Sequence, residues 1–118
     1  MNALEWLHGL AARREFVEKR ALADRLRREL AAYESRLSTA VAILESATAE
    51  AADAEAACRV PPATRIAGAD ERYELARETR RLAGEGFDLA RRQVSLRTGV
   101  LRQLEQELAV TNVTPDRP

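Results

Sequence analysis

The sequence has few of the side chains that support catalysis, metal binding or a thick hydrophobic core. Aromatic residues make up 4 % of its 118 residues, and it contains one cysteine, one histidine and one tryptophan. A lone cysteine cannot close a disulfide within the chain or form a CxxC metal site. A single histidine gives little support to the usual pairing of a nucleophile with an imidazole base. We therefore expect no catalytic residues, no bound cofactor or metal, and no enzymatic activity.

The sequence also lacks a net charge and a long apolar run. Its 19 basic and 19 acidic residues cancel, so there is no long-range field to attract a polyanion. The arginine pairs are interleaved with acidic residues, which argues against a nucleic-acid interface. No apolar run of about 18 residues is present, and the start of the chain lacks a signal-peptide pattern. We expect a cytoplasmic protein that neither binds nucleic acid nor inserts into a membrane.

Three local patterns suggest chemistry, and each has a simpler structural interpretation. Glu5 and His8 have the Glu-x-x-His spacing of di-iron bundles, but the other inward carboxylates of such a site are missing. Gly84 and Gly86 lack the spacing of a phosphate loop, and we interpret them as points of close helix approach. We interpret Cys58 as a small packing residue near the turn.

The proline pair Pro61–Pro62 divides the chain, because each proline removes a backbone donor and restricts the residue before it. Asn2 and Glu5 resemble a capping box at the start of a first helix, and Asp70 is a candidate N-cap for a second. The length fits one domain over residues 1–118. The predicted elements are a helix over about 2–59, a turn over 60–69, a helix over about 70–110 and a mobile tail over 111–118.

Apolar residues in the first helix recur with alternating spacings of three and four, which is typical of a coiled-coil seam. Twelve of the thirteen seam positions are apolar or nearly so, and Lys19 is the exception. The seam positions are Phe16, Lys19, Ala23, Leu26, Leu30, Tyr33, Leu37, Ala40, Leu44, Ala47, Ala51, Ala54 and Cys58.

The second helix carries two apolar rows with a sevenfold step. We assign Leu75, Leu82, Leu89 and Leu96 to the seam. Phe87, Val94, Leu101 and Leu108 form the other row, displaced by roughly 120° around the helix. Because one partner helix cannot cover both rows, we expect the second row to be exposed.

These patterns predict an all-α protein, an antiparallel two-helix coiled-coil hairpin with a proline-bearing turn and an amino-terminal helical overhang. The overhang bears Trp6, and two interpretations of it stay open: it folds back through Gly9 to complete a three-helix core, or it anchors a protein partner. We favour a partner-binding surface made of both exposed areas. Its predicted residues are Trp6, Leu7, Leu10, Phe87, Val94, Leu101 and Leu108.

The two heptad-bearing segments, LRRELAAYESRL and ELARETRRL, flank the proline-bearing turn. In this architecture the chain resembles the stalk proteins of type III export ATPases, the flagellar FliJ and injectisome SctO family. The resemblance implies a stalk, adaptor or chaperone that presents its hairpin to an export ATPase or another secretion component. A self-assembling structural coiled coil, such as a phage or envelope component, is the alternative, and we expect self-association.

Overall fold

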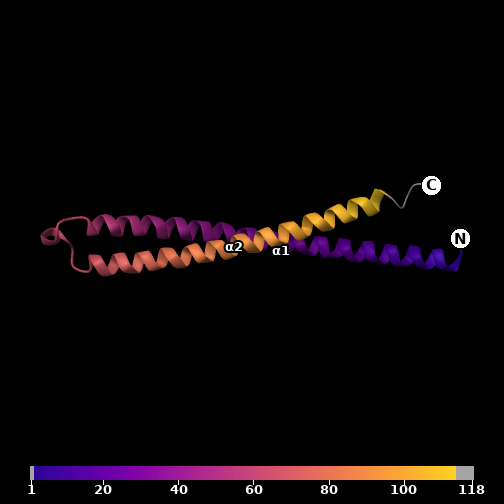
Figure 1. Cartoon of the computed structure of the whole chain (residues 1–118), viewed down its shortest axis with the longest axis horizontal. Helices are drawn as coiled ribbons and strands as arrows, with labels where there is room; N and C mark the ends of the chain where they lie inside the picture. The colour runs from indigo at the N-terminus through magenta and orange to yellow at the C-terminus, as the bar shows by residue number, and fades with distance from the viewer. Residues whose placement is uncertain (1, 114–118) are drawn as a thin grey trace. The chain divides into compact units, whose positions relative to one another are not determined.

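The computed structural model describes residues 2–113, which form two long helices joined by a short turn (Figure 1). Helix α1 spans Ala3–Cys58 and helix α2 spans Ala69–Val113, with a 3-10 turn, η1, over Pro62–Thr64. No strand occurs within this part of the chain. The predicted all-α helical hairpin, with its single break at the proline pair, is confirmed.

The predicted capping box at the start of α1 forms in both directions. The backbone N–H of Glu5 donates to Asn2 Oδ1 at 2.7 Å, and the backbone N–H of Asn2 donates to Glu5 Oε2 at 3.4 Å. Two N–H groups that the first turn leaves unpaired are thereby satisfied. The helix then continues through Gly9 without interruption.

Helix α2 differs from its predicted bounds at both ends. It begins at Ala69, so Asp70 lies within its first turn rather than at the cap. There a carboxylate still favours the helix start through the helix dipole. The helix continues to Val113, three residues into the predicted mobile tail, and the rest of that tail lies outside the described residues.

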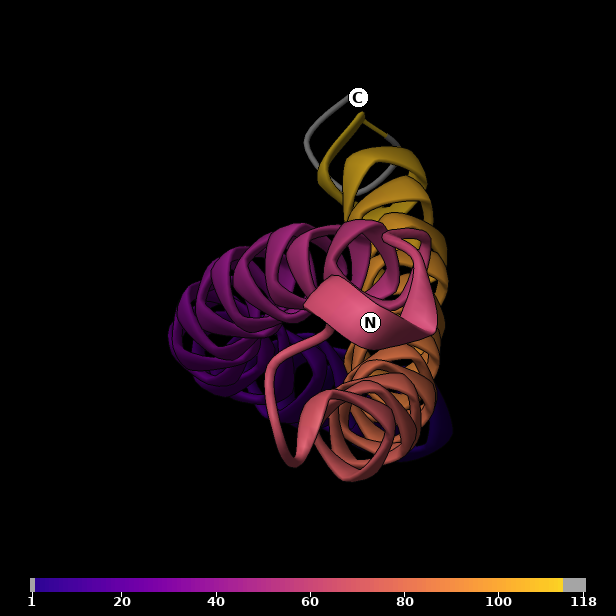
Figure 2. The same cartoon turned by 90° about the vertical axis from the view of Figure 1, so that its left-hand side faces the viewer.

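Contacts between residues divide the chain into two compact units. We call residues 33–93 the turn unit, because it contains the turn and the helix segments on either side of it. We call residues 1–32 with 94–118 the terminal unit, because it contains both chain ends. Figure 2 looks onto the turn of the turn unit.

The core of the turn unit is built from alanine. Ala51 and Ala54 of α1 pack with Ala76 of α2, and Tyr73 covers this cluster. Alanine at facing positions lets two helices approach closely but buries little apolar area. Ion pairing also joins the helices here, because Arg72 binds Glu50 at 2.8 Å.

Larger side chains fill the core of the terminal unit. Ala23 of α1 is fully buried against Leu101 and Leu104 of α2. Three cross-helix ion pairs lie beside this core: Lys19 with Glu107 at 3.3 Å, Arg27 with Glu105 at 3.6 Å, and Arg97 with Glu29 at 4.0 Å. Residues near the start of α1 thus pair with residues near the end of α2, which shows that the two helices run antiparallel.

The predicted seam of α1 is confirmed, since all thirteen of its positions are buried or half-buried. The predicted seam of α2 is wrong. Its four leucines are 54–70 % exposed, whereas the row assigned to the surface faces inward. Leu101 is only 8 % exposed, and Phe87, Val94 and Leu108 are half-buried.

Partner positions explain why α2 uses this other row. The row that contains Phe87 and Leu101 alternates with Ala76, Ala83, Ala90 and Leu104 at spacings of three and four. Ala76 fits against the alanines of α1, and Leu104 fits against Ala23.

Candidate interaction surfaces

Small apolar side chains lie inside the molecule and many large ones lie outside. Seven of the nine buried apolar residues in the described part of the chain are alanine. Large exposed side chains gather in two places, one near the start of α1 and one along α2. Single exposed apolar residues are ordinary, but rows of them along one helix face indicate a site of association.

The N-terminal apolar segment consists of Leu4, Trp6, Leu7 and Leu10. Leu7 lies three residues after Leu4, and Leu10 lies three residues after Leu7 and four after Trp6, so the four side chains fall within about half of the circumference of α1. Every residue from 2 to 15 is exposed, and Trp6 itself is 56 % exposed. Because α1 is one continuous helix through Gly9, the alternative in which Trp6 folds back into a three-helix core is wrong.

The leucine row consists of Leu75, Leu82 and Leu89, all in the turn unit and all more than half exposed. Thr79 and Gly86 alternate with these leucines at a spacing of three or four, so the row has its own heptad pattern. The same step reaches Leu96 in the terminal unit, which is also exposed. The row lies on the side of α2 that faces away from α1, as the exposure of its leucines shows.

The predicted partner surface therefore divides. Trp6, Leu7 and Leu10 are exposed as expected, whereas Phe87, Val94, Leu101 and Leu108 face the seam. Their assignment to an exposed surface was wrong, because α2 turns that row toward α1. The leucine row takes their place on the outside. The sequence signal for this arrangement is the row of alanines at 76, 83 and 90. These alanines fit the small seam positions of α1, so they face inward and the leucine row faces outward.

Charged residues beside the leucine row form a network within α2. Arg81 donates to both carboxylate oxygens of Glu78 and to Glu85 at 2.6 Å. This hydrogen bonding lowers the pKa of Glu78 and raises the pKa of Arg81. No ion pair of Arg92 with its own chain occurs among the described residues.

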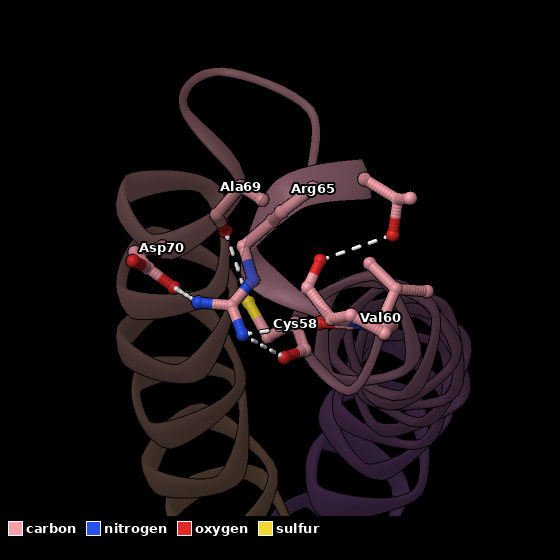
Figure 3. A network of polar contacts seen from close by, with 7 residues as sticks. Cys58, Val60, Arg65, Ala69 and Asp70 are labelled. Atoms are coloured by element: carbon pink, nitrogen blue, oxygen red, sulfur yellow. Dashed lines mark hydrogen bonds and ion pairs between the residues drawn. The ribbon is translucent and has the colours of Figure 1, made fainter.

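One arginine makes several of the polar contacts that hold the turn (Figure 3). Arg65 Nη2 donates to the carbonyls of Cys58 at 2.7 Å and Val60 at 3.3 Å, and Nη1 binds Asp70 at 3.4 Å. The side chain thus connects the last carbonyl of α1 to the first turn of α2. This role of Arg65 is not visible in the sequence, because no local pattern marks an arginine that binds backbone carbonyls.

Cys58 is a half-buried thiol at the end of α1. Its Sγ donates to the Ala69 carbonyl at 3.3 Å, which ties the ends of the two helices together. Loss of solvent raises the pKa of the Cys58 thiol, and the neighbouring Asp70 carboxylate raises it further. Since the thiolate is the reactive form, this environment favours a structural role.

The prediction that Gly84 and Gly86 mark points of close helix approach is wrong. A methyl group placed on Gly84 or Gly86 would meet nothing within 4 Å.

Within the described residues, no group of three or more His, Cys, Asp or Glu side chains is arranged to hold a metal ion. None of the described helices combines the length and apolarity needed to cross a membrane.

Comparisons with known proteins add no relative: no family model matches the chain, and no curated protein or solved structure does.

Proposed function

We propose that the chain is a non-enzymatic coiled-coil hairpin whose function is to bind other proteins through its exposed helix faces. The observation that carries the proposal is the N-terminal apolar segment, in which four large apolar side chains lie exposed on one side of a continuous helix. Helix faces of this kind bind partners through anchors at spacings of three and four. Trp6 is the expected anchor, because tryptophan is enriched among the residues that dominate interface energies.

The narrower proposal is a cytoplasmic stalk, adaptor or chaperone of a type III secretion system. It rests on the resemblance of the two heptad-bearing helices and their proline-bearing turn to export ATPase stalk proteins. The all-α hairpin is compatible with that role. In this proposal the partner is an export ATPase or a neighbouring secretion component, and nucleic acid is not bound.

The test is binding of the full chain to a purified hexameric type III export ATPase. Trp6→Ala removes the anchor, and Ile66→Ala removes a still more exposed apolar side chain from the turn. We expect Trp6→Ala to weaken binding by about ten- to hundredfold. We expect Ile66→Ala to bind like the wild type. Absence of wild-type binding would overturn the type III proposal, and equal affinities of the two variants would overturn the assignment of the anchor.

The alternative function, a self-assembling structural coiled coil, is favoured by a different observation. The leucine row is unoccupied by α1 and has the spacing of a second seam.

A further inference from the structure

We propose that two copies of this chain pair in antiparallel orientation through the leucine row, Leu75, Leu82 and Leu89. This pairing rests on the alternative function, the self-assembling coiled coil, and gives it an interface and an orientation; it uses another face of the molecule and a different partner than the N-terminal apolar segment. All residues that carry the argument lie in the α2 segment of the turn unit. Three observations support it: the heptad pattern of the row, the position of Gly86, and the charges beside the row.

The heptad pattern places a large residue opposite a smaller one in the layers around Gly86 and Thr79. In antiparallel coiled coils the two kinds of seam position face each other across the interface. Leu82 then packs against Gly86 of the second copy, and Leu89 packs against Thr79 of the second copy. The Thr79 hydroxyl already donates to the Leu75 carbonyl at 2.9 Å, so its burial leaves no hydroxyl unpaired.

Gly86 has no role that its own chain explains. It lies in the interior of α2, where glycine disfavours the helix, and a methyl group there would meet nothing of the same chain. It also lies between Leu82 and Leu89, on the face that is turned from α1. A second copy explains it, because Leu82 of that copy needs the space that a side chain at position 86 would fill.

The charges select the antiparallel orientation. With Leu82 beside Gly86 of the second copy, Glu78 falls beside Arg92 of the second copy, and the pair occurs twice by symmetry. Arg92 has no ion pair with its own chain in the described part of the molecule. Glu85 meets its own equivalent near the symmetry axis, where Arg81 at 2.6 Å in the same chain offsets the repulsion.

A parallel pair explains these residues less well. Each Gly86 would face the other Gly86, which leaves a void in the seam rather than a filled layer. Glu78 and Glu85 would lie beside Ala83 and Ala90 of the second copy, with no opposite charge. The antiparallel pair fills the glycine position and satisfies the arginine.

The first test is the dissociation constant of the full chain, measured by analytical ultracentrifugation over a wide concentration range. Gly86→Ala places a methyl group in the proposed contact. Gly84→Ala is the matched control, because it makes the same change two residues away, off the leucine row, where a methyl group also meets nothing. We expect a wild-type dimer, weakening by about tenfold or more in Gly86→Ala, and no weakening in Gly84→Ala. A chain that stays monomeric, or two variants with equal affinities, would overturn the proposal.

The second test is charge reversal, which reports orientation. Glu78→Arg and Arg92→Glu should each weaken the dimer by about tenfold, since both copies change. The double variant should recover the wild-type affinity. Positions 78 and 92 are four helical turns apart in one chain, so this recovery requires a second copy in antiparallel orientation. A double variant that stays weak would overturn that orientation. Circular dichroism checks that every variant keeps its helices.

Failure of this proposal is distinguishable from failure of the proposed function. Trp6→Ala should leave the dimer unchanged, whereas Leu82→Glu should abolish it and leave Trp6 exposed. A dimer lost in Trp6→Ala would place the contact at the N-terminal apolar segment and overturn the leucine-row interface.

Discussion

Arg72 of α2 donates two hydrogen bonds to a single carboxylate oxygen of Glu50 on α1, from Nε at 3.0 Å and from Nη2 at 2.8 Å. Both side chains are about half exposed, so solvent screens the pair. We expect a double-mutant cycle with Glu50→Gln and Arg72→Gln to give a coupling free energy below about 1 kcal/mol. The coupling should fall further in high salt. A coupling of several kcal/mol would show that the alanine core of the turn unit depends on this pair.

Two leucine substitutions test which face of α2 packs against α1. Leu101→Asp buries an unpaired carboxylate beside Ala23 and should lower the free energy of unfolding by about 3 kcal/mol or more. Leu96→Asp changes an exposed residue and should lower it by less than about 0.5 kcal/mol. Thermal unfolding of dilute samples, followed by circular dichroism, measures both. Equal melting temperatures would contradict the register.

Two glycines have opposite expected responses to alanine. Gly68 has a φ of +83°, in the left-handed region, so Gly68→Ala should destabilise the chain by about 1 kcal/mol. Gly99 lies in the interior of α2 with open space around it, and Gly99→Ala should stabilise by up to about 1 kcal/mol. Urea unfolding reports both changes. A stabilising Gly68→Ala would mean that the turn has another conformation in solution.

Cys58 should be slow to react with iodoacetamide at neutral pH. Its pKa is raised above the usual 9.0, so the folded chain holds the thiol proton to higher pH than the unfolded chain does. The resulting stability is fully present below pH 9 and is lost as the pH rises through the folded pKa. Asp70→Asn removes one cause of the shift and should move the alkylation midpoint to lower pH. A midpoint below that of the unfolded chain would contradict the packing described here.

Much of the fold follows from local sequence. The Asn2–Glu5 capping box, the break at Pro61–Pro62 and the α1 seam each depend on residues within a few positions of one another. Backbone donors, proline geometry and heptad spacing therefore suffice to predict them.

The face that α2 turns inward does not follow from α2 alone. Helix α2 has two apolar rows, and either could face α1. The row with the more regular leucines stays exposed, because α1 presents small residues such as Ala54 to α2. A coiled-coil seam depends on the fit between two helix surfaces. The small alanines at 76 and 90 therefore help to decide which face of α2 turns toward α1. The Arg65 contacts in the turn were missed for the same reason, since their acceptors are backbone carbonyls that only the folded turn brings together.

The accessibility of Trp6 in the dilute full-length chain tests the central claim most directly, that large apolar side chains are presented to other proteins. Acrylamide quenching and the emission wavelength report the environment of the single indole. The structure predicts a readily quenched, water-exposed indole that shifts to shorter wavelength on binding the hexameric export ATPase. An indole already shielded from acrylamide in the dilute monomer would contradict the claim.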